Sequence, residues 1–250
     1  MRSGPRDAVE NMALDEAMLL MAADEGVTLV RLYQWAGPSV SFGRNQRTVG
    51  IYDVNRCQAL GVPAVRRLTG GRALLHGREV TYAVAAPSRT APTLRGGYEA
   101  INDVLLSALQ ALGIDAKRAA PATRTPSPGL APCFETPSAG ELVVHGRKIV
   151  GSAQHRDSRA FLQHGSILLA DDQGILNELA LVPLPIVPPP ATLGGLIPGI
   201  DTETVIAAIT DALRAVASGG IVVSSETDIP MHHFRTALTR YRDPLWTWRR

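Results

Sequence analysis

Apolar residues recur at helical spacing in three parts of the chain. Residues 11–24 place leucine, alanine and methionine side chains on one face, and Gly26 follows as a helix terminator. Residues 98–113 repeat this pattern and also end in a glycine. A third helix is expected after Asp201, whose side chain can cap the first turn, and it should end at Gly219-Gly220. The pattern therefore predicts three amphipathic helices.

Short extended runs lie between these helices. A β-hairpin is predicted over residues 141–154, with His145-Gly146 as its turn, because glycine supplies a positive φ. Further strands are predicted at 27–33, 40–43, 64–68, 79–85, 161–169 and 221–226. Helices interspersed with hairpin-like strands indicate an α+β fold, with a mainly antiparallel sheet packed with helices. The regular alternation of a doubly wound parallel sheet is not visible.

A tract with five prolines, residues 181–190, interrupts the pattern, because proline lacks the backbone donor that helices and sheets need. We predict a main domain over 1–182, a Pro/Gly-rich linker over 183–200, and a small C-terminal helical segment over 201–250 that packs on the same domain. The length of 250 residues suits one large domain with a small appendage.

The composition narrows the class of protein. An apolar fraction of 45% and a charged fraction of 19% are those of an ordinary globular protein. A formal charge of +2 is too small to indicate nucleic acid as the partner. The first ten residues lack the apolar core of a secretory signal, and no run approaches the roughly 18 apolar residues of a membrane helix. Two cysteines are not a disulfide framework, so we expect a reducing, cytosolic location without a membrane partner.

Basic side chains gather in two stretches of the sequence. They are Arg66, Arg67, Arg72 and Arg78 in the first, and Arg147, Lys148, Arg156 and Arg159 in the second. Such runs are usually solvated faces. From the sequence alone, a solvated face and a functional surface explain these two clusters equally well.

Two segments place polar groups where they could meet a ligand. RRLTGGRALLH, residues 66–76, runs a strand into Gly70-Gly71, where backbone N–H groups can approach a ligand, although a plain turn is commoner. GRKIVGSAQ, residues 146–154, sets Lys148 between apolar strand residues. That lysine is either an edge-strand gatekeeper, the commoner case, or an inward-facing functional cation.

The two cysteines have different surroundings. Cys57 lies in a predicted helical turn at residues 56–60, beside apolar neighbours, as buried packing cysteines do. Cys133 lies in PCFETPS, residues 132–138, where flanking prolines predict an exposed loop. The loop context favours reactivity at Cys133 without deciding it.

Histidine and metal chemistry receive less support. The adjacent His232-His233 cannot readily serve one metal, and no CxxC or HExxH spacing occurs, so no metal site is predicted. His76 and His164 are either active-site residues or hydrogen-bonded core histidines. The sequence also lacks the GxSxG elbow and both nucleotide fingerprints, GxxxxGK[ST] and GxGxxG.

Taken in order, five segments resemble the lipoate-protein ligase and octanoyltransferase superfamily, which is related to biotin ligases. They are N-x-A-L-D-E at Asn11–Glu16, RRLTGGRALLH, EVTYAV, GRKIVGSAQ and QHGSILL, over roughly two-thirds of the chain. The stretch from Cys133 to Gln154 most resembles the Gram-positive-type octanoyl-[acyl carrier protein]:protein N-octanoyltransferases. The resemblance implies a biotin/lipoate ligase-like catalytic domain and an acyltransferase activity in lipoate biosynthesis.

The resemblance also assigns roles. It implies that Cys133 takes octanoate from acyl carrier protein and passes it to a lysine of a lipoyl-carrier protein, such as the glycine cleavage H protein, while Lys148 holds the acyl carbonyl. The implied acyl tunnel is lined on one side by Arg67, Thr69, Gly70, Gly71, Arg72 and His76, and on the other by Gly151, Ser152 and Ala153. No cofactor and no metal is implied, and ATP would be needed only by a ligase.

Three alternatives stay open. The first is an octanoyl amidotransferase that moves octanoate between lipoyl domains. The second is an ATP-dependent lipoate-protein ligase, although ligases usually have an Asn-Asp pair where this chain has Ala139-Gly140-Glu141, and a larger C-terminal domain. The third is a non-catalytic acyl- or lipoyl-domain-binding protein, which retention of Cys133 and Lys148 disfavours.

Overall fold

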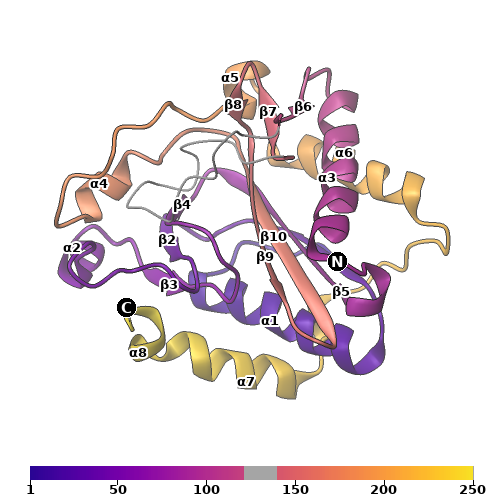
Figure 1. Cartoon of the computed structure of the whole chain (residues 1–250), viewed down its shortest axis with the longest axis horizontal. Helices are drawn as coiled ribbons and strands as arrows, with labels where there is room; N and C mark the ends of the chain where they lie inside the picture. Colours follow the sequence, from indigo (N-terminus) through magenta and orange to yellow (C-terminus); the bar gives the residue numbers. More distant parts are fainter. Residues whose placement is uncertain (121–139, 250) are drawn as a thin grey trace.

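The computed structural model describes residues 1–120 and 140–249. Its largest sheet is antiparallel, with strand order β1-β5-β10-β9 (Figure 1). These strands are β1 (Leu29–Tyr33), β5 (Glu79–Pro87), β10 (Ala160–Leu168) and β9 (Val150–Arg156). Helices pack on this sheet, so the predicted α+β class with a mainly antiparallel sheet is confirmed.

The other strands form two three-stranded sheets with orders β3-β2-β4 and β6-β7-β8. They are β2 (Ser39–Phe42), β3 (Ala64–Arg66), β4 (Leu74–His76), β6 (Lys117–Arg118), β7 (Leu142–Val144) and β8 (Arg147–Lys148). The β2–β3 pair is parallel, and the remaining pairs are antiparallel.

The predicted hairpin forms between β7 and β8. Its turn residues His145 and Gly146 have φ angles of 49° and 73°, in the left-handed region that glycine adopts without strain. At Ile149 the chain leaves this small sheet, and β9 pairs with β10 in the large one. The segment predicted as one hairpin therefore joins two sheets, with Lys148 at the end of the first and Gly151 near the start of the second.

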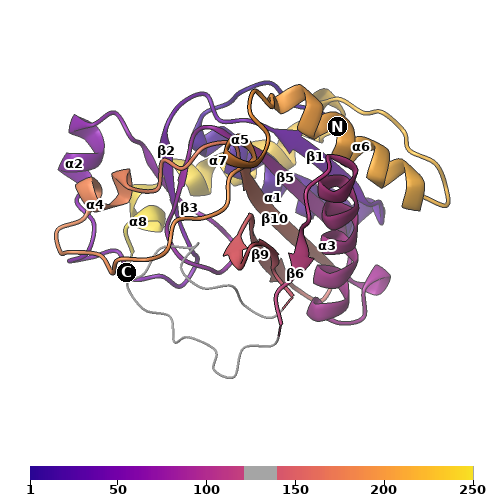
Figure 2. The ribbon, with the colours of Figure 1, turned by 90° about the horizontal axis from the view of Figure 1, so that it is seen from above.

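Helices lie on both faces of the large sheet. The helices of the described residues are α1 (Ala8–Glu25), α2 (Val54–Ala59), α3 (Leu94–Ala111), α4 (Ile175–Leu179), α5 (Leu193–Leu196), α6 (Thr202–Val216), α7 (Met231–Arg242) and α8 (Pro244–Thr247), with 3-10 turns at Ser88–Thr90 and Glu226–Asp228. Side chains alternate along β5, so Ala83 and Ala85 join the core with α1, whereas Tyr82 and Val84 join the core with α3 and α6. Figure 2 shows α3 and α6 side by side, and the two helices pack together.

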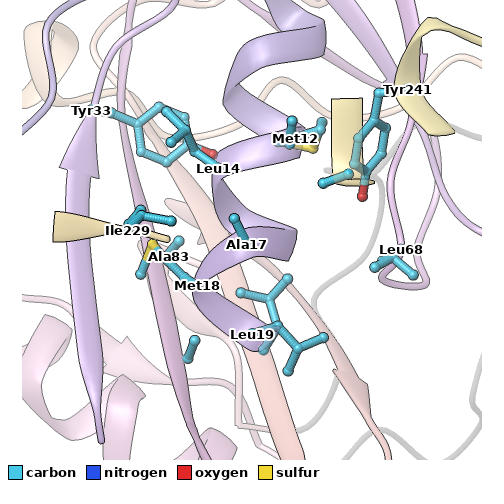
Figure 3. Close-up of a cluster of buried hydrophobic side chains, with 14 of the residues drawn as sticks. Met12, Leu14, Ala17, Met18, Leu19, Tyr33, Leu68, Ala83, Ile229 and Tyr241 are labelled. Carbon is cyan, nitrogen blue, oxygen red and sulfur yellow. The ribbon is translucent and has the colours of Figure 1, made fainter. Parts of the chain in front are cut away.

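Helix α1 is the central helix of the core that carries the candidate site. The Asp7 carboxylate accepts a hydrogen bond from the backbone of Glu10, and Gly26 ends the helix at a φ of 71°. Met12 and Met18 of α1 are buried with Tyr241 of α7, the helix that packs against α1 (Figure 3). Burial between a sheet and a second helix explains why the polar residues Asn11, Asp15 and Glu16 of α1 are inaccessible to solvent.

Two local predictions are wrong. Residues 221–225 form no strand, and the side chains of Val222 and Val223 are 88% and 84% exposed, because no neighbouring strand pairs with them. Helix α6 ends at Val216, before Gly219-Gly220, because Ala217 leaves the helical region with a ψ of 92°.

The proline tract 181–190 contains no helix or strand, as predicted. Within the predicted linker, Ala191 and Leu193 are fully buried. The division into 1–182, 183–200 and 201–250 stays a prediction. None of the helices in the described ranges has the length and apolar character of a membrane span.

Candidate active site

A narrow cavity lies between α1, the large sheet and β4. Its lining residues are Met12, Tyr33, Trp35, Arg67, Leu74, His76, Thr81, Gly151, Ser152, Ala153, His164, Gly165 and Ser166. Of the predicted site residues, five line this cavity: Arg67, His76, Gly151, Ser152 and Ala153. The structure thus brings together the RRLTGGRALLH and GRKIVGSAQ segments, which are far apart in the sequence. Cys133 lies outside the described residues.

The glycine turn is held by the Arg67 side chain. Its guanidinium donates to the backbone carbonyls of Gly70 and Arg72, both at 3.0 Å, and to the carbonyl of Ser41 at 2.8 Å. Gly71 has a φ of 93°, and a Cβ there would lie 3.0 Å from an Arg67 nitrogen. Of the two explanations left open for this basic cluster, the solvated face does not hold for Arg67, which is 4% exposed, because its charge is turned inward onto backbone oxygens.

Sequence reasoning missed Gly43, which the turn requires. A Cβ on Gly43 would lie 2.0 Å from the carbonyl oxygen of Gly71, so the two backbones approach as closely as only glycine permits. The available signal was a glycine at the end of a predicted strand, which often marks close backbone approach.

His76 uses both ring nitrogens within the protein. Its Nε2 lies 2.6 Å from the Ser41 hydroxyl, its Nδ1 lies 2.8 Å from Glu79 Oε1, and its ring stacks on Trp35 with centroids 3.7 Å apart. Burial lowers the pKa of His76, so the ring is neutral, Nδ1–H donates to the carboxylate, and Nε2 accepts from Ser41. Burial alone would raise the pKa of Glu79, but the facing His76 ring and the hydroxyls of Ser166 and Thr81 outweigh it and lower that pKa.

His164 is held in the same way on another part of the wall. Its Nδ1 lies 2.8 Å from Asp15 Oδ2, and its Nε2 lies 2.7 Å from the Thr69 hydroxyl. Both histidines are therefore core residues with fully used ring nitrogens, and both also line the cavity. The hydrogen-bonded core explanation therefore holds for both histidines, and a role for either in the active site stays a prediction.

Lys148 is buried, so the gatekeeper explanation is wrong. Its ammonium donates to Glu141 Oε1 at 2.7 Å, and the two side chains are 4% and 9% exposed. Three residues later the same segment forms the cavity wall at Gly151. The structure favours the inward-facing cation over a solubilising edge residue.

Gly165 on β10 and Tyr82 on β5 were also missed by the sequence analysis. They allow the close packing of β5, β10 and β9 next to Gly151. A Cβ on Gly165 would lie 2.4 Å from the carbonyl oxygen of Gly151 and 2.7 Å from the Tyr82 ring. Because Gly165 has no side chain, the Tyr82 hydroxyl reaches Ser152 Oγ at 2.7 Å. A glycine inside the predicted strand QHGSILL was the signal for this close approach.

The second cysteine is a packing residue. Cys57 is 4% exposed, and burial together with the nearby Asp53 raises the pKa of its thiol to about 11. A thiol in that state is a poor nucleophile at neutral pH. In residues 1–120 and 140–249, no group of three or more histidine, cysteine, aspartate or glutamate side chains is arranged to hold a metal ion.

Comparison with known proteins identifies the family. Residues 7–190 match the model described as the lipoyl protein ligase A/B catalytic domain. The chain belongs to this family. It is 43% identical over 192 residues to octanoyltransferase LipM of Kyrpidia tusciae, a match that covers 73% of this chain and 70% of that protein. Octanoyltransferase LipM of Staphylococcus aureus is 39% identical over 175 residues, covering 66% of this chain and 63% of the relative. The chain thus spans about two thirds of the length of these curated relatives.

Solved structures support the fold. A putative lipoate protein ligase from T. acidophilum with bound lipoic acid superposes with a TM-score of 0.79 at 17% identity, over 99% of this chain and 98% of that one. A lipoate-protein ligase A bound with ATP gives 0.78 at 18% identity, over 99% and 96%. At this identity the likeness concerns the fold alone, and it confirms the expected lipoate ligase-like architecture.

Proposed function

We propose that this protein moves an octanoyl group from acyl carrier protein, through a thioester on Cys133, to a lysine of a lipoyl-carrier protein such as the glycine cleavage H protein. Octanoyl transfer in lipoate biosynthesis follows from the family and from curated relatives that are named octanoyltransferases. The observation that carries the site assignment is a buried ammonium, Lys148, on the segment that continues into the cavity wall at Gly151–Ala153.

The chemistry requires a thiolate and an oxyanion donor. The Cys133 thiolate attacks the thioester carbonyl carbon, a new C–S bond forms, and the carrier thiolate leaves and takes up a proton. The neutral acceptor lysine then attacks the carbonyl carbon of the cysteine thioester, a C–N bond forms and the C–S bond breaks. The nitrogen loses a proton, and the cysteine sulfur leaves and takes up a proton. An ordinary cysteine with a pKa of about 8.5 is only a few per cent ionised at neutral pH, so a nearby cation helps to form the thiolate.

Lys148 is suited to act as the oxyanion donor. A preorganised donor aimed at a developing oxyanion contributes about 3–4 kcal/mol in well-studied cases. Exchange of one thioester for another is nearly isoenergetic, and conversion of a thioester to an amide is downhill, so no ATP and no cofactor enter the proposed reaction. Cys133 lies 15 positions before Lys148 in the sequence. We propose a cytoplasmic location with this function, because a free catalytic thiol suits a reducing compartment.

The cavity must adapt to its proposed ligand. Its volume is about 20 Å³, room for about one water molecule, whereas an eight-carbon chain is several times larger. Side chains of the wall therefore have to move when an acyl chain enters. His76 and His164 retain no free ring nitrogen for a substrate, so their part is to shape the wall.

Intact-mass spectrometry after mixing with octanoyl-carrier protein tests the proposal. Wild-type protein and Cys57→Ala should gain one octanoyl group, and Cys133→Ser should gain none while keeping its fold, because a serine hydroxyl has no comparable ionised fraction. An adduct on Cys57, or near-native transfer by Cys133→Ser, would reject the thioester on Cys133. Transfer only from free octanoate with ATP would indicate a ligase, and transfer only from an octanoylated lipoyl domain would indicate the amidotransferase.

Exposed basic side chains support an acidic partner. Arg66, Arg67 and Lys148 are buried, which leaves Arg72 and Arg156 among the partly exposed basic groups. We propose that they steer the carrier, with an attraction screened over about 8–10 Å at physiological ionic strength. The KM for octanoyl-carrier protein should rise with salt and in Arg72→Glu, but not in Arg214→Glu, whose exposed side chain pairs with Asp211 on α6. A salt-independent KM would remove steering from the proposal.

A further inference from the structure

The segment N-x-A-L-D-E of α1 has no part in the proposed chemistry, yet its aspartate is buried beside the cavity. Asp15 is 1% exposed and receives three side chains. Arg31 Nη1 lies 3.2 Å from Oδ1, the Tyr33 hydroxyl 2.9 Å from Oδ2, and His164 Nδ1 2.8 Å from Oδ2. A carboxylate only accepts hydrogen bonds, so each of these partners is a donor.

From Asp15 the contacts continue to the glycine turn. When Nδ1 of His164 carries the proton and donates to Asp15, Nε2 can accept from the Thr69 hydroxyl, which lies 2.7 Å away. Thr69 is fully buried and directly precedes Gly70-Gly71. The backbone N–H of Gly70 in turn points to the carbonyl of Gln154 in β9 at 3.4 Å. A continuous path of contacts therefore runs from α1 through β10 to the turn and the opposite wall.

We propose that Asp15 is a positioning residue for acyl transfer: through His164 and Thr69 it fixes the glycine turn against β9. This inference rests on the proposed function of the cavity as the acyl site. Thr69 and Ser41 are both 0% exposed, so neither hydroxyl is placed as a nucleophile, and their role is to hold the wall.

The same arrangement occurs a second time in the cavity, which argues against coincidence. Glu79 faces Nδ1 of His76, and Ser41 faces its Nε2, just as Asp15 and Thr69 face the two nitrogens of His164. In both cases a buried carboxylate fixes which ring nitrogen carries the proton, as in catalytic triads. A fixed tautomer gives the hydroxyl one orientation and the turn one position.

Nitrogen-15 NMR of histidine-labelled protein tests the first step, and His164→Gln identifies the signal. In the wild type at pH 7.5, Nδ1 of His164 should carry the proton and Nε2 should not. Asp15→Asn should shift the tautomer toward Nε2–H, because a carboxamide can also donate. A wild-type ring protonated at Nε2 would overturn the proposal, and this measurement does not depend on enzyme activity.

A double-mutant cycle on octanoyl transfer tests the second step. Asp15→Asn and Thr69→Val should each lower kcat/KM by about 10- to 100-fold, by analogy with the carboxylates that orient metal-bound histidines. The double variant should be no more than about 3-fold worse than either, because both act on one path. Tyr33→Phe removes a contact to Asp15 on the same path, so its effect should likewise not multiply with that of Thr69→Val.

Multiplying effects of Asp15→Asn and Thr69→Val would overturn the proposal. If Asp15→Asn does not fold, the double-mutant cycle of His164→Gln with Thr69→Val replaces it. The NMR measurement of the His164 tautomer in the wild type remains as the second test. Absence of octanoyl transfer by the wild type would reject the proposed function instead, and the NMR result would stand by itself.

Discussion

Replacing Lys148 with methionine should destabilise the protein by removing one side of a buried ion pair. The Nζ and Oε1 atoms of Lys148 and Glu141 are 2.7 Å apart, and the side chains are 4% and 9% exposed. Loss of one partner from such a pair leaves an uncompensated buried charge, which costs about 3–5 kcal/mol in known cases. We expect about 3 kcal/mol here, at the lower end of that range, because the carboxylate keeps some access to water.

Urea unfolding at pH 7.5 measures this loss. At an unchanged m-value of about 3 kcal/mol per molar urea, Lys148→Met should lower the midpoint by about 1 M. Adding Glu141→Gln should recover more than half of that shift, because the remaining amide carries no charge. Octanoyl transfer should be slower than in the wild type by about 100- to 1,000-fold in both variants, since neither supplies the oxyanion donor.

The chain offers a matched control, because it contains two lysines. Lys117 pairs with Asp115 at 3.0 Å, but both side chains are 71% exposed. Lys117→Met should therefore change stability by only about 0–1 kcal/mol. The reasoning is refuted if Lys148→Met and the double variant unfold at the same urea concentration, because the loss would then not come from the unpaired carboxylate.

Two further predictions concern packing and acid stability. Gly165→Ala should lower the free energy of unfolding by more than about 2 kcal/mol, because its Cβ would lie 2.4 Å from the carbonyl oxygen of Gly151. The control Gly174→Ala should be tolerated, because a Cβ at Gly174 meets no atom within 4 Å. Equal melting temperatures of the two variants would contradict this prediction. Acidification should destabilise the protein. Burial lowers the pKa of His76 in the folded state, so the unfolded chain binds more protons as the pH falls through 6.5. The stability that comes from the lowered pKa of Glu79 is lost below pH 4.5. In urea unfolding between pH 7.5 and 5.5, His76→Gln should show a shallower loss than the wild type, and an equal slope would count against the assignment.

Local signals predicted the elements well. Gly26 ends α1 and Asp201 caps α6 because both effects depend on residues within one helical turn. The His145-Gly146 turn was predictable for the same reason. The strand expected at 221–226 failed, because β-branched residues form a strand only where a partner strand is present.

The candidate site was predictable in its segments but not in its contacts. The resemblance marked the two walls, yet the pairing of Asp15 with His164 joins residues 149 positions apart, and no local pattern encodes it. The burial of Arg67 was likewise not predictable, because the sequence shows the charge of this side chain but not the carbonyl oxygens that it meets. Gly43 and Gly165 were missed since their need for glycine comes from backbone atoms that are distant in the sequence, at Gly71 and Gly151.

The last helix and the first strand of the site segment exchange hydrogen bonds. Arg66 donates from Nε to the carbonyl of Thr247 at 2.9 Å, and the Trp246 indole donates to the carbonyl of Arg66 at 2.8 Å. These residues are 180 and 181 positions apart, so the loop that they close is among the longest in the protein. Contacts of such sequence separation form late and slow the folding rate. Until α8 docks, Arg66 lacks both of these partners, so the segment that leads into the glycine turn should be among the last to gain protection from hydrogen exchange.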